Sequence, residues 1–217
     1  MPAPKPTIPE LVDLVHRYYP TGIESDDPGH GSTEESCRLA SVHEAAAIAC
    51  GKQYNAIPDD ERVSVDPEVI AVVNTLHSWR QFGERCRRAF PDCLVWDESG
   101  PYFDPGYRYS VNQPGYVHPS DEERDPVFCA FSVLAPVYVI YAYVQGSEWL
   151  PDVCYARFPE RHKARVNKLS LLAEEIFGFH RLDEETVLTP VPDVAPFGSN
   201  RSMSKTTLMH CLFSPHP

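Results

Sequence analysis

An uncharged run of eighteen residues, 127–144, constrains the fold of this chain more than any other segment does. Its length would allow a helix that crosses a membrane. Pro136 lies at its centre, however, most of its side chains are β-branched or aromatic, and the segment before it is acidic. We therefore expect two adjacent antiparallel strands, joined at Ala135 and Pro136 and buried inside a soluble domain. A membrane-spanning helix is the alternative.

The two strands expected in this run lack alternation between apolar and polar residues. This indicates that both of their faces are covered and that they lie in the middle of a sheet. Other segments of the chain also have the composition of strands, with turn residues between them. They are residues 93–97, 107–111 and 206–213, with 153–158 as a further candidate.

Helix signals dominate the N-terminal part of the chain. Thr7 and Glu10 form a capping-box pattern, which starts a helix that ends before Pro20. Further helices are expected from residues 32–35 to Gly51, over 66–90, and over 159–177. Grouped helices followed by grouped strands indicate an α+β fold. The prediction is that N-terminal helices pack on a central, mostly antiparallel sheet, with one further long helix before the C-terminal strand.

The helix expected over residues 159–177 carries its charges in an unusual order. Its first half holds the basic side chains Arg161, His162, Lys163, Arg165 and Lys168. Glu174 and Glu175 lie near its end, so this order opposes the helix dipole. Solvation together with pairing to an acidic loop would explain the order. The alternative is a dedicated site for an anion.

The length of 217 residues and the hydrophobic content of 42% are sufficient for one compact domain with its own core. We expect a single domain over residues 1–217, with residues 1–6 disordered. No signal-peptide pattern fits the N-terminus. The seven cysteines are an odd number without a C-x-x-C pair, which is typical of reduced thiols in the cytoplasm.

Charge gives the strongest indication of function. The 31 acidic and 19 basic side chains give the chain a formal net charge of −12. Such a charge steers a domain towards basic partners and repels nucleic acid and anionic membranes. We therefore expect a binding protein whose partner is a basic protein, and we expect neither nucleic acid nor a membrane as a partner.

The common catalytic signatures are missing from the sequence. It contains no G-x-S-x-G, G-x-G-x-x-G or H-E-x-x-H pattern and no phosphate-binding loop of the G-x-x-x-x-G-K type. The nine histidines show neither i,i+4 pairing nor clustering with cysteines, so no metal and no cofactor are expected. The prediction is that the chain is not an enzyme. An enzyme with a non-standard site based on Cys and His is the alternative.

Acidic and aromatic side chains cluster between residues 96 and 123. Rigid aromatic groups beside carboxylates are typical anchors of protein interfaces. The predicted partner-binding residues are Trp96, Asp97, Glu98, Tyr102, Tyr116, Asp121, Glu122 and Glu123. Tyr107 and Tyr109 lie in the same region, but alternate tyrosines of one strand can instead fill the core. The competing site is an acidic face on the helical N-terminal half: Asp26, Asp27, Asp59 and Asp60.

The stretch from residue 172 to residue 213 has a recognisable pattern. Phe177-Gly178-Phe179 follows an apolar helix end. The sequence LTPVPDV at 188–194, Thr207-Leu208 and residues 211–213 come after it. This pattern resembles the C-terminal part of bacterial proteins, of the kind found in myxobacteria, that are encoded beside polymorphic toxins and are suspected to be their immunity proteins.

The resemblance implies a non-enzymatic inhibitor that protects the producing cell by binding a toxin domain, often a nuclease. It transfers no toxin-binding residue to this chain. Because a nuclease site is basic, an acidic inhibitor can mimic phosphate there and gain association rate by electrostatic steering. We therefore expect a cytoplasmic immunity protein that occludes the active site of a basic toxin. The alternatives are the Cys/His enzyme and a regulatory protein-interaction domain.

Overall fold

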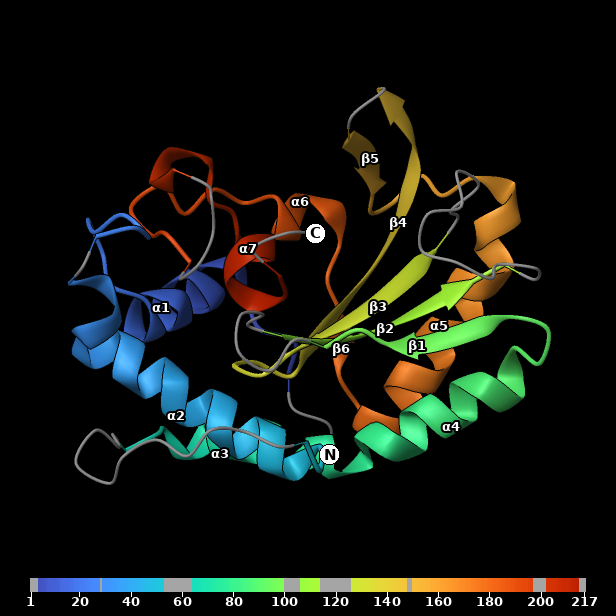
Figure 1. Cartoon of the computed structure of the whole chain (residues 1–217), viewed down its shortest axis with the longest axis horizontal. Helices are drawn as coiled ribbons and strands as arrows, with labels where there is room; N and C mark the ends of the chain where they lie inside the picture. The colour runs from blue at the N-terminus through green and yellow to red at the C-terminus, as the bar shows by residue number, and fades with distance from the viewer. Residues whose placement is uncertain are drawn as a thin grey trace.

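The computed structural model describes residues 4–27, 29–52, 64–99, 106–113, 126–147, 150–196 and 202–214. Its centre is an antiparallel sheet in the order β1-β2-β3-β4-β5, and a short strand, β6, pairs with β4 in parallel. The strands are β1 (Leu94–Asp97), β2 (Gly106–Asn112), β3 (Val127–Ser132), β4 (Val137–Ser147), β5 (Leu150–Cys154) and β6 (His180–Arg181). Helices precede and follow this sheet in the sequence, as Figure 1 shows, which confirms the predicted α+β fold.

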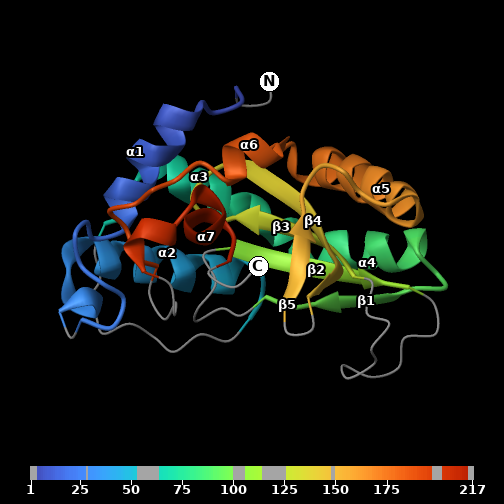
Figure 2. The same ribbon diagram turned by 90° about the horizontal axis from the view of Figure 1, so that it is seen from above.

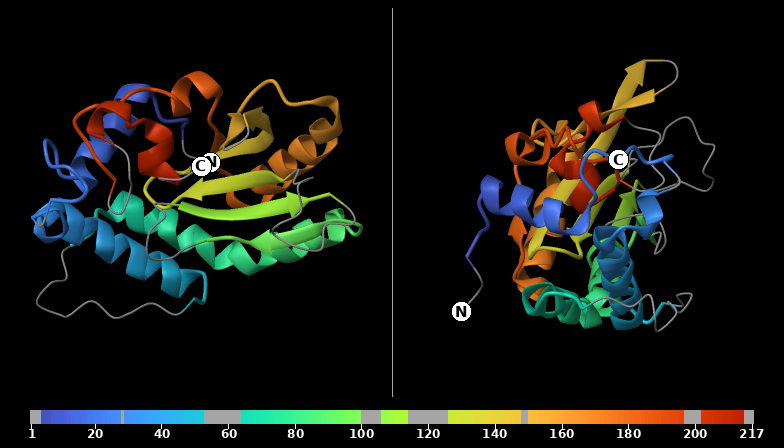
Figure 3. Two further views of the ribbon diagram at one scale, coloured as in Figure 1. Left: turned by 45° about the horizontal axis from the view of Figure 1, so that its top comes forward. Right: turned by 90° about the vertical axis from the view of Figure 1, so that its left-hand side faces the viewer.

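The α-helices lie along one face of the sheet and at one of its ends. They are α1 (Ile8–Tyr18), α2 (Glu34–Ala49), α3 (Pro67–Thr75), α4 (Trp79–Ala89), α5 (Glu160–Phe177), α6 (Glu184–Val187) and α7 (Leu208–Leu212). α4 and α5 contact each other, and they pack on β1 and on β3 and β4, respectively (Figure 2). α1 packs against α2 and α7, and α2 packs against α3 (Figure 3). Among the N-terminal helices, α4 therefore provides the closest packing on the sheet.

α1 begins where the sequence predicts it. The Thr7 hydroxyl accepts the amide of Glu10, and the Glu10 carboxylate accepts the amide of Thr7 at 2.7 Å, which completes the expected capping box. The helix buries Leu11, Leu14, Val15 and Tyr18. Just after the helix, the Tyr19 hydroxyl donates to the backbone carbonyl of Cys211 at 2.7 Å. This bond joins segments from opposite ends of the described chain.

The helix predicted over residues 66–90 is divided into two. α3 ends at Thr75, a 3₁₀ turn covers Leu76–Ser78, and α4 starts at Trp79. The Thr75 hydroxyl donates to a carbonyl of the preceding turn, a bond of the kind that bends helices. Trp79 is buried, with its ring centre 4.7 Å from that of Tyr109 on the sheet. The expectation of one continuous helix was therefore wrong, because packing of Trp79 on the sheet outweighs local helix propensity.

The uncharged run forms two antiparallel strands, as predicted. β3 and β4 pair from Val127 opposite Ala142 to Phe131 opposite Tyr138. Each of them has a neighbour on both sides in the sheet, which confirms their central position. No helix in the described segments has both the length and the apolar character that crossing a bilayer requires.

The side of the sheet that faces α4 and α5 is aromatic. Tyr107 and Tyr109 of β2 are buried here against Trp79, so the alternative in which these tyrosines fill the core is correct. Gly83 of α4 makes room for them, because a Cβ atom at this position would lie 2.3 Å from the Tyr109 hydroxyl oxygen. Phe177 of α5 also contacts this layer of rings.

α5 matches the helix predicted over 159–177, and Gly178 ends it with a φ of 67°. Two of its basic side chains bond to backbone carbonyls of neighbouring elements. Buried Arg165 donates to the Val111 carbonyl at 3.1 Å, and Lys168 donates to the Ala89 carbonyl at 2.5 Å. Because Ala89 is the last residue of α4, Lys168 offsets the negative end of that helix.

The C-terminal strand predicted over 206–213 was wrong, because residues Leu208–Leu212 form the short helix α7. The Thr207 amide donates to Nδ1 of the His210 ring at 2.9 Å and so caps the first turn. Every side chain of α7 is buried, so its apolar pattern has no helical period. Periodicity cannot distinguish a short buried helix from a buried strand.

Candidate functional site

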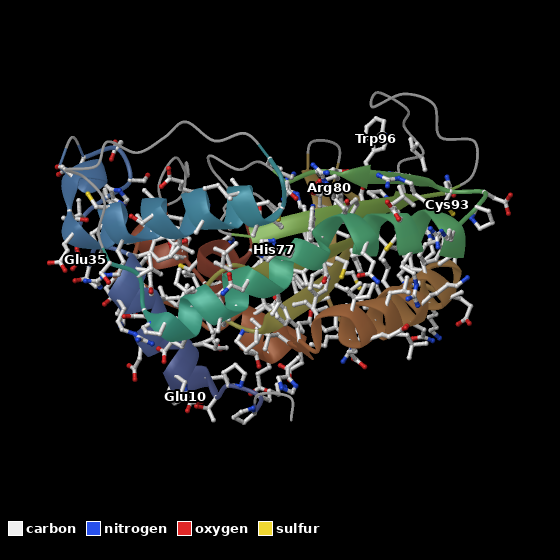
Figure 4. The ribbon with its side chains drawn as sticks, turned by 90° about the horizontal axis from the view of Figure 1, so that it is seen from below. Glu10, Glu35, His77, Arg80, Cys93 and Trp96 are labelled. Carbon is white, nitrogen blue, oxygen red and sulfur yellow. The ribbon has the colours of Figure 1, made fainter. Side chains whose placement is uncertain are left out.

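The predicted partner-binding residues that the structure describes lie at one edge of the sheet, on β1 and directly after it. Side chains of a strand alternate between its two faces, and the pairing of Asp97 with Tyr109 places Asp97 on the side that faces the helices. Trp96 points to the opposite side and is 39% exposed (Figure 4). Glu98, two residues further on, continues the side of Trp96. The strand therefore separates the three neighbouring residues of the prediction.

Asp97 is held by hydrogen bonds within the chain. Its carboxylate accepts bonds from Lys52 Nζ at 2.9 Å, from Trp79 Nε1 at 2.9 Å and from Ser99 Oγ at 2.7 Å. The side chain of Asp97 is 27% exposed, and that of Lys52 is 20% exposed. This network joins the end of α2 and the start of α4 to β1, so Asp97 acts first as a structural carboxylate.

Glu98 is fixed through its backbone. Its amide donates to the Arg108 carbonyl at 3.0 Å, and the Arg108 amide donates to Ser99 Oγ at 3.0 Å. These bonds continue the β1-β2 pairing beyond the end of β1. Trp96 and Glu98 are thus carried by a segment whose backbone is well bonded, which favours a preorganised surface.

The remaining residues of the predicted site lie outside the described residues. They are Tyr102, Tyr116, Asp121, Glu122 and Glu123. Of the competing N-terminal site, Asp59 and Asp60 also lie outside the described residues, whereas Asp26 and Asp27 are exposed. One oxygen of Asp27 accepts the Gly29 amide at 2.8 Å. The structure therefore describes residues 96–98 of the predicted site and Asp26 and Asp27 of the competing site.

Sequence reasoning missed two basic residues near β1. Lys52 bonds to Asp97 and places its ammonium group 5.3 Å from the ring centre of Tyr107. Arg80 of α4 donates to the carbonyl of Gly51, the residue before Lys52 (Figure 4). These contacts join residues far apart in the sequence, so no local pattern could have revealed them. They make this edge less acidic than the sequence cluster suggests.

Five of the cysteine thiols lie in surroundings that disfavour the thiolate. All seven cysteines are free. Burial raises the pKa of Cys50 and of Cys86 to about 12, and it raises the pKa values of Cys129 and Cys211 as well. Because the thiolate is the reactive form, a raised pKa makes these thiols poor nucleophiles at neutral pH. Burial also raises the pKa of Cys93, although Arg165 and Lys168 act in the opposite direction.

Histidines in the described segments show no shared site. Burial lowers the pKa of His43 to about 4, so this ring is neutral at pH 7. His162 accepts a bond from Arg165 Nη2 at 2.9 Å. Across the described ranges, no three His, Cys, Asp or Glu side chains gather in an arrangement that could hold a metal ion.

Comparisons of the chain with family models, with curated proteins and with solved structures found no significant match. The resemblance of residues 172–213 to suspected immunity proteins therefore stays a prediction. So does the assignment of a partner surface to residues 96–123.

Proposed function

We propose that this chain is a non-enzymatic immunity protein that binds a basic toxin domain, such as a nuclease, and occludes its active site in the cytoplasm of the producing cell. The observation that carries the proposal is an exposed tryptophan, Trp96, on the terminal strand of a domain with a net charge of −12. Large aromatic side chains are typical interface anchors, and complementary charge steers partners together.

The contacts of β1 support different roles for the neighbouring residues Trp96, Asp97 and Glu98. Trp96 would be the anchor that the toxin buries, and Glu98 would add attraction at the rim of the interface. Asp97 would position both of them, because its bonds to Lys52 and Trp79 hold the strand against α2 and α4. A surface that is fixed before binding loses less conformational entropy on association.

The test is the binding kinetics of the chain with the product of the neighbouring gene at two salt concentrations. We expect Trp96→Ala to speed dissociation about tenfold or more, because a buried aromatic anchor contributes about 1–2 kcal/mol or more. Glu98→Lys should slow association and flatten its salt dependence, with an effect on affinity of a few tenths of a kcal/mol.

Two exposed residues on other elements provide matched controls. Leu188→Ala removes another exposed apolar side chain, and Glu185→Lys reverses an exposed acidic charge on α6. Unchanged kinetics for Trp96→Ala and Glu98→Lys, with a response to Asp26→Lys and Asp27→Lys instead, would move the site to the N-terminal half. The Cys/His enzyme predicts no salt-dependent partner at all, and a regulatory interaction domain predicts a neighbouring gene that encodes no toxin.

A further inference from the structure

A basic hollow lies at the opposite edge of the sheet from β1. It has a volume of about 450 Å³ and is bordered by the first half of α5, by the segment that precedes α5, and by β6. Its basic side chains are Arg157, Lys163 and Arg181, and its other lining includes Asn167, Phe158 and Val166. Such a collection of cations is unexpected on a chain with a net charge of −12.

The strand pairing explains why the hollow forms. β5 pairs antiparallel with the second half of β4, while β6 pairs in parallel with Val137 and Tyr138 at its start. The segment that follows β5 continues along β4 towards β6 and brings Phe158 close to Arg181. α5 then supplies Lys163, Val166 and Asn167, which share one helix face because they are three and four residues apart.

The position of Arg181 is well defined. Its backbone is part of the β4-β6 pairing, opposite Tyr138. Its guanidinium group lies 5.7 Å from the ring centre of Phe158, which is a cation–π contact. This contact uses the face of the guanidinium group, so its N–H donors can still bond to a ligand.

Two of the three cations lack an acidic partner in the part of the chain that the structure describes. No described carboxylate forms an ion pair with Arg157 or Arg181, whereas Arg17, Arg38 and Arg85 each have one. Lys163 pairs with Glu160 at 2.6 Å, and the Glu160 side chain is 86% exposed. The hollow therefore carries a net positive charge that the described residues do not neutralise.

We propose that this hollow binds a small organic ligand that carries a phosphate group. Arg157 and Arg181 would hold the phosphate oxygens through paired N–H donors, with Lys163 adding a third charge. The Asn167 amide would donate a further hydrogen bond, and Phe158 and Val166 would contact the organic part. A dianionic phosphate matches the two arginines that lack a described acidic partner better than a single carboxylate does.

The charge of the whole chain selects between two sources of such a phosphate. The same phosphate chemistry occurs in soluble phosphate esters and in lipid headgroups. A net charge of −12 repels an anionic membrane surface, whereas a small ligand can diffuse to a locally basic hollow. The soluble ester is therefore the source that we propose.

The experiment is a titration of the ¹⁵N-labelled full chain with phenyl phosphate, followed by amide chemical shifts. We expect saturable shifts around residues 156–167 and 181. Arg157→Gln and Arg181→Gln should each raise the dissociation constant about tenfold, because each removes a charge-assisted bond. Arg87→Gln is the matched control, since Arg87 is an exposed arginine of α4, and it should leave the constant unchanged.

Further probes separate the remaining explanations. Inorganic phosphate should bind more weakly than phenyl phosphate, because it lacks the group that contacts Phe158 and Val166. Equal affinity for the phenylacetate anion, which carries a single carboxylate, would contradict the phosphate assignment, and tight binding to vesicles with phosphatidic acid would point to a lipid. Absence of saturable shifts, or equal losses for Arg87→Gln, would overturn the site. If Arg181→Gln does not fold, Arg157→Gln and Asn167→Ala carry the same test.

Discussion

At the β1 edge of the sheet, Asp97 accepts hydrogen bonds from Lys52, Trp79 and Ser99. At the other edge, Arg157 and Arg181 border a hollow without an acidic partner among the described residues. The Asp97 carboxylate is occupied by hydrogen bonds within the chain, whereas Arg157 and Arg181 are available to a ligand. A charged residue in a sequence cluster therefore indicates a binding site only if the fold leaves its bonds unfilled.

The comparison also refines the acidic site. Sequence clustering treats Trp96, Asp97 and Glu98 as one patch, but strand alternation places Asp97 against the helices. If this separation is correct, substitutions at Asp97 should act mainly on stability, and those at Trp96 mainly on binding.

The largest expected effect is that of Asp97→Ala. It leaves the Trp79 N–H and the Lys52 ammonium group without their acceptor in a partly buried region, so we expect a loss of about 3–4 kcal/mol in the free energy of unfolding. Asp97→Asn keeps the shape and one acceptor oxygen and should lose less. Urea unfolding measures both. An ordinary surface substitution costs less than about 0.5 kcal/mol. A loss in that range for Asp97→Ala would show that Asp97 is not a structural carboxylate.

His43 differs from both groups of charged residues, because burial keeps its ring neutral. Its pKa is lowered from 6.5 to about 4 in the folded chain by burial. The unfolded chain therefore takes up a proton first as the pH falls. The free energy of unfolding should be unaffected by His43 above about pH 6.5 and should fall by about 3 kcal/mol as the pH approaches 4.

Chemical denaturation at a series of pH values tests this expectation. His43→Leu should flatten the stability profile between pH 6.5 and 4, whereas substitution of the exposed His77 by Gln should not. An unchanged profile for His43→Leu would show that the ring is protonated in the folded chain or reaches solvent.

The smallest expected effect is that of Arg157→Gln on stability. Because Arg157 has no acidic partner in the described segments, its loss should change the free energy of unfolding by less than about 0.5 kcal/mol. Thermal and urea unfolding of this variant and of Asp97→Ala compare how much stability a charged residue contributes at each edge of the sheet. A loss comparable to that of Asp97→Ala would show that Arg157 has a structural role.

Local signals in the sequence predict the parts of the fold that depend on neighbouring residues. The Thr7–Glu10 capping box, the helix end at Gly178 and the two strands of the uncharged run all follow from nearby side chains. α7 could not be predicted in this way, because its burial on all sides removes the helical period. The break before Trp79 likewise depends on packing against distant Tyr109.

The candidate sites were less predictable than the fold. Trp96 was predicted to bind a partner and is 39% exposed, but the bonds of Asp97 to Lys52 and Trp79 join residues 45 and 18 positions away. The only sign of the hollow in the sequence was the charge order of the helix at 159–177, which opposes the helix dipole. An anion site was the alternative explanation of that order. Its assembly depends on β5 and β6 sharing one edge of β4, which no local pattern encodes.

The contact between α1 and α7 also affects how the chain reaches its folded state during synthesis. Leu208, Cys211 and Leu212 are completely buried, and the Cys211 carbonyl takes the Tyr19 hydroxyl bond across 192 positions. A nascent chain that still lacks these residues has an unfilled site beside α1 and an unclosed core. The packing of α7 on α1 therefore cannot form until residue 212 has been synthesised, and this part of the core closes late in synthesis.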